Sequence, residues 1–430
     1  MSNFGGVVDS KAGGAIVLIV GGGGREHALA RSLLESTDVT AVHVAPGNAG
    51  TALIATNHAV TASDVEAQVK LAKKVGADLV VVGPEAPLVS GLADRLRGEG
   101  ILCFGPDADN AMLEGSKLRA KEVMRDLSVP TADFHVLDQS SDFDAALDDF
   151  SGNPWVIKRD VLAGGKGVVV TSDRDEAKEF ISQSIASDGK VLLEDFLPGE
   201  EASMLVIMDE SAAICLPPSQ DHKRVGEGDV GLNTGGMGAY CPAPVITDEV
   251  RDKVMERIVG PMHIGLRSQV NPYRGVLYVG LMIDSQGDPY VVEFNVRFGD
   301  PECQVTMPLI SSDVYHLLVA AAAGRLDTYE AAFSTGHCLT VVLAAEGYPG
   351  PPAKGREITG RGLSSTGEAW VIHAGTGMQD GKLVSTGGRV LSATGYGKDL
   401  ATAARQAYSV LEEITLEGSH YRRDIGFRAL

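Results

Sequence analysis

The sequence predicts an α/β protein, α+β when the whole chain is counted, in which a parallel sheet comes first and strand-rich regions follow. Two observations support this prediction. Residues 15–105 alternate short β-rich runs with helical patterns, the order typical of a parallel sheet wrapped by helices. From about residue 116 this rhythm changes, and strands joined by glycine-rich connections take over.

The first region contains four predicted strands with helices between them. The strands are expected at 15–20, 40–45, 77–82 and 101–104, and the helices at about 26–35, 64–75 and 88–97. Turns rich in glycine, proline or asparagine follow the first three strands, at 21–27, 46–50 and 83–87. Because the carboxyl ends of parallel strands meet at one edge of the sheet, we expect a ligand there.

The rest of the chain predicts further strands around a long loop. Strands are expected at 155–158, 168–170, 191–196 and 201–208, and a glycine-rich loop at 218–240. A loop of that length in a compact domain usually serves function or is disordered. A helix capped by Thr247 then leads to a strand pair at 275–284 and 290–297. A β-rich region from about 338 ends in a helix at about 399–414.

Composition excludes several classes of function. The 430 residues carry a formal net charge of −20, which disfavours non-specific binding to nucleic acid or anionic lipid. Five scattered cysteines without a CxxC pair argue against structural zinc and fit a reducing compartment. No apolar run approaches the ~18 residues of a membrane span. Residues 1–14 lack a signal core and are expected to be a disordered extension, so we expect a cytoplasmic protein.

The stretch Tyr290–Phe298 has the most distinctive pattern in the chain. Its even positions are all apolar, and its later odd positions are Glu293, Asn295 and Arg297. In a regular strand one face would therefore pack on a core, while the other presents a carboxylate, a carboxamide and a guanidinium. Such oxygen donors suit Mg²⁺ bound to phosphates, and an arginine beyond them suits a transferring group. An edge strand with a polar solvent face explains the pattern equally well.

The first glycine loop, at 21–27, resembles a dinucleotide-binding turn only in part. The place of the third glycine holds Glu26 or His27, and the second strand ends without an acidic residue for a ribose. A phosphate or sugar phosphate at a helix N-terminus fits this loop better.

Two later segments add candidate cations. The loop Gly164-Gly165-Lys166-Gly167 lies between two strands and is not a Walker-type loop, but it could fold over a polyphosphate, with Lys158 nearby. Residues 219–224 hold an acid, an imidazole and two cations before the glycine run 232–240. Taken singly, the first segment is slightly better explained as an ordinary exposed turn, and the second has the composition that is usual for a solvated face.

Many ordered motifs together identify a resemblance. The chain resembles the phosphoribosylamine–glycine ligases (glycinamide ribonucleotide synthetases) of the ATP-grasp superfamily from about residue 15 onward. The motifs that carry it are GGREHAL, APGNAGT, VGPEAPLV, LEGSK, GGKGV, LLEDFLPGEEAS, SQDHKRVG, NTGGMGAY, EFNVRFGDPE, TGGRVL and RRDIGFRA.

The resemblance implies a reaction and an architecture. The reaction joins glycine to 5-phosphoribosylamine with ATP, through glycyl phosphate, in purine synthesis. The implied fold is an ATP-grasp fold with a Rossmann-like N-terminal domain at 15–115. The ATP-grasp domain is then expected at 116–337, its lid at about 130–205, and a β-rich domain at 338–430.

The resemblance also implies roles for individual residues. ATP would be held by Lys117, Lys158, Gly164, Gly165, Lys166, Gly167, Glu194, Phe196, Leu197, Glu200 and Glu201. Mg²⁺ or Mn²⁺ would be held by Glu293 and Asn295. Phosphoribosylamine would be bound by Gly23, Arg25, Glu26, Asn48, Gly50 and Glu85. Glycine and the phosphoribosyl group would be seated with the help of Asp221, Lys223 and Arg224, and the acyl phosphate would be stabilised by Arg297. The residues expected to act in catalysis are Arg297, Lys158, Lys223 and Asp221.

The sequence departs from the family pattern beside the ATP loop. Val161 replaces a glycine, and Arg159 replaces a small residue. A positive φ at Val161 would be costly for a β-branched side chain. Rival functions are another ATP-grasp ligase or carboxylase acting on bicarbonate or formate, a binding protein without turnover, and an NAD oxidoreductase. The expected partners are small molecules, with no nucleic acid or membrane, in a monomer or at most a weak homodimer.

Overall fold

The computed structural model describes residues 14–152, 154–162, 167–364 and 367–430. Its first sheet is wholly parallel, with the strand order β3-β2-β1-β4-β5. The strands are β1 (Ala15–Gly21), β2 (Val39–Pro46), β3 (Thr56–Asn57), β4 (Leu79–Val82) and β5 (Leu102–Phe104). The predicted parallel sheet is confirmed, and only the short edge strand β3 was not expected. Residues 1–13 of the expected extension lie outside the described residues.

Helices follow the strands of this sheet as the alternating pattern predicts. They are α1 (Gly24–Leu33), α2 (Thr51–Ile54), α3 (Val65–Val75), α4 (Glu85–Val89) and α5 (Leu92–Gly98). The single helix expected at about 88–97 is wrong, because α4 and α5 are separate. Gly91 between them has φ +81°, a left-handed conformation that interrupts a helix.

A second sheet is antiparallel and has the order β11-β10-β16-β17. Its strands are β10 (Glu200–Met208), β11 (Ala213–Cys215), β16 (Gly275–Ile283) and β17 (Pro289–Asn295). The helices around it are α6 (Ala108–Gly115), α7 (Lys117–Asp126), α10 (Asp248–Val254), the π-helical turn η1 (Met255–Val259) and α11 (Gly260–Arg267). Thr247 caps α10 as predicted, its side chain accepting from the backbone N–H of Val250.

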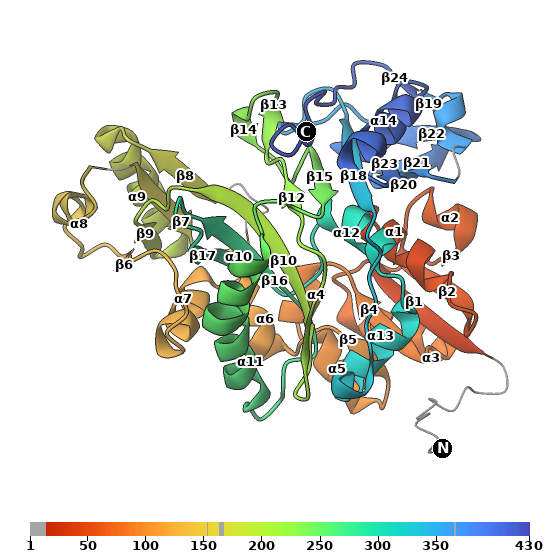
Figure 1. Ribbon diagram of the computed structural model, residues 1–430, viewed down its shortest axis with the longest axis horizontal. Helices are drawn as coiled ribbons and strands as arrows, with labels where there is room; N and C mark the ends of the chain where they lie inside the picture. The colour runs from red at the N-terminus through yellow and green to blue at the C-terminus, as the bar shows by residue number, and fades with distance from the viewer. Residues whose placement is uncertain (1–13, 153, 163–166, 365–366) are drawn as a thin grey trace.

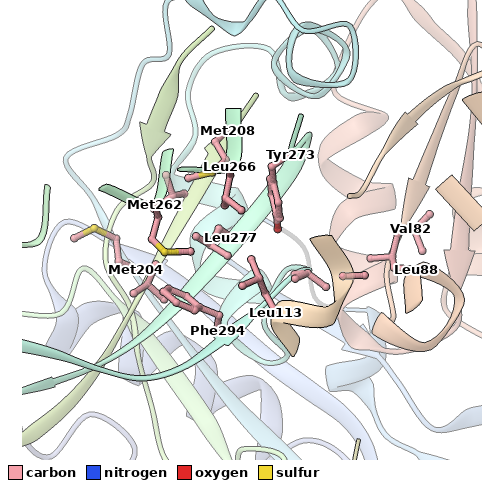
Figure 2. Close-up of a cluster of buried hydrophobic side chains, with 14 of the residues drawn as sticks. Val82, Leu88, Leu113, Met204, Met208, Met262, Leu266, Tyr273, Leu277 and Phe294 are labelled. Atoms are coloured by element: carbon pink, nitrogen blue, oxygen red, sulfur yellow. The ribbon is translucent and has the colours of Figure 1, made fainter. Parts of the chain in front are cut away.

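The first and second sheets share a hydrophobic core. In Figure 2, Val82 of β4 and Leu88 of α4 lie on one side, Leu113 of α6 lies between, and Phe294 of β17 and Leu277 of β16 lie on the other. All five are buried. Burying one such side chain contributes about 1.5–3 kcal/mol, so this core holds the two sheets together.

Strand β17 is irregular, which corrects the predicted alternation. Gly280 pairs with Glu293, but the next residue of β16 pairs with Val291, so Val292 is an unpaired bulge residue. As a result Val291 is buried, whereas Tyr290 and Val292 are half-exposed. The prediction that all even positions face the core is therefore wrong before the bulge and correct after it, at Phe294, Val296 and Phe298.

A third sheet forms a separate lobe, at the left of Figure 1. Its order is β6-β9-β7-β8. The lobe contains β6 (Phe134–Leu137), α8 (Phe143–Asp149), β7 (Trp155–Arg159), β8 (Val168–Thr171), α9 (Arg174–Asp188) and β9 (Val191–Glu194). It has its own small core, which includes Trp155, Ile157 and Ile181.

A fourth sheet, at the upper right of Figure 1, joins distant parts of the chain in the order β12-β15-β18-β23-β20. Its strands are β12 (Gln220–Asp221), β15 (Gly238–Cys241), β18 (His337–Ala344), β20 (Ala369–His373) and β23 (Arg389–Gly397). The smaller elements near it are β13 (Arg224–Gly226), β14 (Val230–Asn233), β19 (Ile358–Thr359), η4 (Arg361–Ser364), β21 (Thr376–Gln379), β22 (Lys382–Ser385), α14 (Leu400–Leu411) and β24 (Thr415–Leu416). The prediction of a long loop at 218–240 is therefore wrong, since four short strands form there.

The remaining helices connect the second and fourth sheets. They are α12 (Glu302–Thr306), η2 (Met307–Leu309), α13 (Val314–Ala322) and η3 (Leu326–Thr328). Within the described part of the chain, no helix has the length and apolar character needed to cross a membrane.

Candidate active site

Two buried lysines meet one buried glutamate where the lobe of the third sheet faces the second sheet. The Nζ atoms of Lys158 in β7 and Lys121 in α7 each lie 2.9 Å from Oε2 of Glu194. Lys158 also donates to the carbonyl of the bulge residue Val292, at 3.1 Å. The other carboxylate oxygen of Glu194, Oε1, is buried and has no hydrogen-bond partner among the described residues. That oxygen is free to accept from a ligand.

Lys117 lies at the start of α7, close to the same cluster. Its Nζ donates to the carbonyl of Val161 at 3.1 Å, and burial lowers its pKa. Val161 is not among the described residues with a positive φ, so it does not carry the backbone strain that a positive φ would cause in a β-branched residue. Arg159 turns away from the cluster, because its guanidinium grips both carboxylate oxygens of Asp188 at 2.6 and 2.8 Å.

Glu293 projects from β17 among several cations. Burial alone would raise its pKa, but Lys223, Lys158, Lys117 and Arg297 together hold the pKa below its ordinary value. Among the described residues, no hydrogen bond or ion pair reaches this carboxylate. Asn295, two residues on, is buried and accepts from Arg297 at 2.9 Å through its Oδ1.

Arg297 lies just beyond the end of β17 and is held by acids. Its NH2 donates to Oε1 of Glu114 at 2.8 Å, and its Nε lies 3.5 Å from Oε2 of Glu85. These neighbours raise its pKa above the ordinary value, although burial opposes them. Glu114 also accepts from the backbone N–H of Val296, so α6 fixes the segment after the strand.

A second group of charges lies beside β10 and β12. Lys223 donates to Oε1 of Glu201 at 2.6 Å. Burial opposes the charge of Lys223, but Glu201 and Asp221 offset it and hold its pKa well above the usual range. Burial raises the pKa of Asp221 to about 7, with Lys223 opposing the rise. Arg224, in contrast, lies on an exposed hairpin and donates to the carbonyl of Gly231 at 2.8 Å.

A cavity of about 360 Å³ opens between the first and fourth sheets. It is lined by Gly22, Gly23, Gly47, Asn48, Asp300, Tyr348, Ala374, Gly375, Thr376, Thr386 and Arg389. Arg389 donates to the backbone carbonyls of Gly235 and Asp300. Burial opposes the charge of Asp300, but Arg389 and Arg25 lower its pKa.

The residues expected to bind phosphoribosylamine divide into two groups around this cavity. Gly23 and Asn48 line it. Arg25 and Glu26 are buried and pair with each other at 2.7 Å, and Arg25 also donates to the carbonyl of Phe298. Gly50 is packed against the rings of His27 and His373 rather than against the cavity.

Three residues expected to hold ATP lie at or after the end of β9. Phe196 and Leu197 follow β9 and are half-buried. Glu200 begins β10, and its carboxylate accepts from Gln220 at 2.9 Å. Gly167 is described and accepts from the backbone N–H of Arg159 at 2.8 Å. Gly164, Gly165 and Lys166 lie outside the described residues.

Comparison with known families decides what this arrangement is. Three models of phosphoribosylglycinamide synthetase match in chain order: the N domain over residues 15–114, the ATP-grasp (A) domain over 115–303 and the C domain over 338–428. The chain belongs to the phosphoribosylglycinamide synthetase family.

Relatives in this family match the chain over nearly its whole length. The phosphoribosylamine–glycine ligase of Mycobacterium bovis is 50% identical over 419 residues, covering 96% of this chain and 98% of the relative. That of Salmonella typhi is 45% identical over 423 residues, with the same shares covered. The crystal structure of the Thermotoga maritima ligase superposes with a TM-score of 0.84 at 35% identity, covering 96% of this chain and all of that one.

The fold extends beyond the phosphoribosylglycinamide synthetases. The biotin carboxylase domain of the Hydrogenobacter thermophilus 2-oxoglutarate carboxylase has a TM-score of 0.73 at 19% identity, covering 94% of this chain and 91% of that one. At this identity the likeness shows the shared ATP-grasp fold alone.

Four residues that the sequence did not single out lie among these ion pairs or line the cavity: Lys121, Glu114, Asp300 and Arg389. A signal existed for each. Lys121 stands one helical turn after Lys117, and the other three lie inside the motifs LEGSK, EFNVRFGDPE and TGGRVL.

Proposed function

We propose that this chain joins glycine to 5-phosphoribosylamine, converting ATP to ADP and phosphate and forming glycinamide ribonucleotide for purine synthesis. One observation carries the proposal. The short stretch from Glu293 through Arg297 to Asp300 runs from the cation cluster to the glycine-lined cavity. A site that activates an acid with ATP and a site that binds an amine thus share one segment.

In this proposal the ATP phosphates are bound by Lys117 and Lys158, together with Gly164, Gly165, Lys166 and Gly167. The buried Oε1 of Glu194 has no partner in the part of the chain that the structure describes, which supports an adenine site beside it, since this oxygen can accept from an amino group. Phe196 and Leu197 form the hinge around the base. Glu200 and Glu201 lie near the ribose.

The residues at β17 fit a divalent cation. The Glu293 carboxylate has no partner among the described residues, and the Asn295 Oδ1 keeps a second lone pair. No group of three or more acidic, histidine or cysteine ligands occurs in the described part of the chain. Two protein oxygens plus phosphates and water suit Mg²⁺, or Mn²⁺, better than a metal with an all-protein cage. When bound, the ion neutralises phosphate charge.

The chemistry proceeds in two balanced steps. A carboxylate oxygen of glycine attacks the γ-phosphorus of ATP, the bond to the β-γ bridging oxygen breaks, and ADP leaves. The amine of phosphoribosylamine then attacks the carbonyl carbon of glycyl phosphate, loses a proton and expels phosphate. Arg297, held by Glu114 and Glu85, stabilises the charge on the transferring group.

The two remaining substrates are held by two groups of residues. Asp221 and Lys223 seat glycine, because a carboxylate and an ammonium complement a zwitterion, and Arg224 forms the hairpin that follows them. Gly23 and Asn48 border the cavity for phosphoribosylamine. Arg25, Glu26, Gly50 and Glu85 support that site by fixing its loops. We add Arg389 as the cation that receives the sugar phosphate there.

The wider setting follows from the same proposal. We propose a cytoplasmic enzyme that acts on small molecules and not on nucleic acid or membranes, as a monomer or at most a weak homodimer. Its domains are residues 15–115, 116–337 with the lid at about 130–205, and 338–430. Lys117, Lys158 and Lys223 concentrate positive charge at the site despite the net charge of −20.

A steady-state assay tests the function. We expect ADP release only when glycine, phosphoribosylamine, ATP and Mg²⁺ are all present, with one glycinamide ribonucleotide formed per ADP. ADP release with bicarbonate or formate, and none with glycine, would assign the chain to another ATP-grasp ligase or carboxylase.

A further inference from the structure

Residues 422–428 pack against the hairpin formed by β13 and β14. Arg422 is fully buried, and its NH1 donates to Oδ1 of Asp229 at 2.7 Å and to the carbonyl of Arg224 at 3.0 Å. Arg428 donates to the other carboxylate oxygen of Asp229. One hairpin carboxylate is therefore held by two guanidinium groups of the same distant segment.

Hydrogen bonds from backbone N–H groups also link the two segments along the hairpin turn. The N–H of Gly228 donates to Asp424 at 2.7 Å, and the N–H of Arg423 donates to Glu227 at 3.1 Å. Arg422 also holds the carboxylate of Asp424 with its Nε and NH2, both at 2.8 Å. Charge-assisted bonds of this kind are roughly twice as strong as neutral ones, so the turn is fixed firmly.

The same segment reaches the residue between the proposed glycine-binding side chains. His222 stands between Asp221 and Lys223, is fully buried, and accepts from the N–H of Gly426 at 3.2 Å through its Nε2. Its ring contacts those of Tyr240 and Phe427, with centroids 5.9 and 5.7 Å away.

The residues that follow β14 in sequence lead to the cavity. The carbonyl of Gly235, just after the hairpin, accepts from Arg389, and its N–H donates to the Tyr348 hydroxyl at 3.0 Å. Arg389 and Tyr348 both line the cavity. The segment before the hairpin thus carries Asp221 and Lys223, and the segment after it contacts the cavity wall.

We propose that residues 422–428 are a positioning element for the acid and amine substrates, acting through Asp229 and His222 on the hairpin that joins the two halves of the site. This inference rests on the proposed function. Asp229, Arg422 and His222 touch no substrate and act by fixing Asp221 and Lys223.

Asp229→Asn is the main test variant. Asp229 has φ +57°, a left-handed conformation that asparagine adopts readily, so the variant keeps the turn and removes only the charge that Arg422 and Arg428 bind. Asp380→Asn is a matched control, because Asp380 is an exposed aspartate with φ +51° that makes no ion pair among the described residues.

For Asp229→Asn we expect the KM for glycine to rise and kcat/KM for glycine to fall about tenfold to a hundredfold, the usual effect of a small misplacement. The KM for ATP should stay within about twofold and the thermal midpoint close to wild type, and Asp380→Asn should match wild type throughout. An unchanged KM for glycine would overturn the inference. So would equal changes for glycine and ATP, since these indicate general loosening.

A pair of histidine variants gives an independent test. Glutamine places an oxygen near the position of Nε2, whereas asparagine places it near Nδ1, so only His222→Gln keeps an acceptor for Gly426. We expect His222→Asn to raise the KM for glycine and His222→Gln to restore it to within about threefold of wild type. Equal values for the two variants would count against the inference. A wild-type protein without glycine-dependent ADP release would overturn the proposed function itself.

Discussion

At the scale of single residues, the bulge at Val292 decides how β17 serves the site. Because Val292 is unpaired, its carbonyl is free to accept from Lys158, which links the third sheet to the second sheet. Gly280 stands opposite Glu293, and a Cβ there would lie 3.3 Å from the Cγ of Glu293. A side chain at Gly280 would therefore crowd the carboxylate. The Glu293–Asn295 face was predictable from alternation, but the bulge was not, since alternation assumes a regular strand.

Removal of the Glu293 carboxylate tests its proposed role with the metal and phosphates. We expect Glu293→Ala to lower kcat about 10²–10³-fold or more, because an electrostatic contact to the transferring group is lost. Its circular dichroism spectrum and thermal midpoint should stay near wild type. Glu256→Ala, on the exposed surface of η1, is the control. A Glu293 variant within tenfold of wild type would discredit the metal role.

The titration of Asp221 predicts a pH dependence for glycine. Its carboxyl has a pKa of about 7, so it is mostly neutral below that pH and charged above it. A charged carboxylate attracts the ammonium of glycine. We therefore expect the KM for glycine to fall about tenfold between about pH 6 and about pH 8. In Asp221→Asn the KM should be high and nearly independent of pH over this range. A wild-type KM that rises with pH would contradict the assignment.

Part of the candidate site could not be predicted because its charged side chains contact residues that are far away in the sequence. Arg389 and Asp300 are 89 residues apart in sequence, yet their contact forms one wall of the cavity. Glu114 meets Arg297 across a separation of 183 residues. Local pattern identifies charged residues but not which distant group each of them meets.

At the scale of elements, the loop from Pro46 to Gly50 joins the first sheet to the fourth. The side chain of Asn48 donates to the carbonyls of Gly22 and His373 at 3.0 and 2.9 Å, so it ties two loops of the cavity together. The turn itself was predictable from its glycines. Its contact with β20 was not, because that strand lies more than 300 residues away.

Gly50 tests this junction. A Cβ at Gly50 would lie 2.5 Å from the His27 ring and 2.6 Å from His373, so we expect Gly50→Ala to destabilise the protein by about 1–3 kcal/mol. Gly98→Ala is the control, because no atom lies within 4 Å of its added Cβ and its φ is ordinary. That variant should be neutral or more stable by up to about 1 kcal/mol. Denaturant unfolding gives both values, and equal stability of the two variants would contradict the packing described.

At the scale of the whole molecule, shared cores explain which parts form one body. The first and second sheets share buried side chains, whereas the lobe of the third sheet has a core of its own. The parallel sheet could be predicted because its strands alternate locally with helices. The fourth sheet could not, because β15 pairs with β18 across about one hundred residues, as Cys241 does with Cys338.

Three buried histidines predict how the whole molecule responds to acid. Burial lowers the pKa of His27 and His222 to about 3 and that of His373 to about 4. The folded state thus binds fewer protons than the unfolded state, whose histidines have pKa values near 6.5. Stability should therefore fall as the pH drops from about 7 toward about 4.

Calorimetry checks this response. We expect the thermal midpoint to decrease steadily between about pH 7 and about pH 5, and the decrease to be smaller in His373→Asn, which removes one titrating ring. A midpoint that is constant or rises over this interval would show that the buried rings do not govern acid stability.

The proposed reaction depends on the formation of glycyl phosphate, and the fate of the glycine carboxylate oxygens reports whether it forms. Glycine labelled with oxygen-18 in its carboxylate should be converted with ATP, Mg²⁺ and phosphoribosylamine, and the released phosphate analysed by mass spectrometry. We predict one labelled oxygen in each phosphate, because the oxygen that attacks ATP leaves with the phosphoryl group. Phosphate without label would show that glycine is not activated as glycyl phosphate.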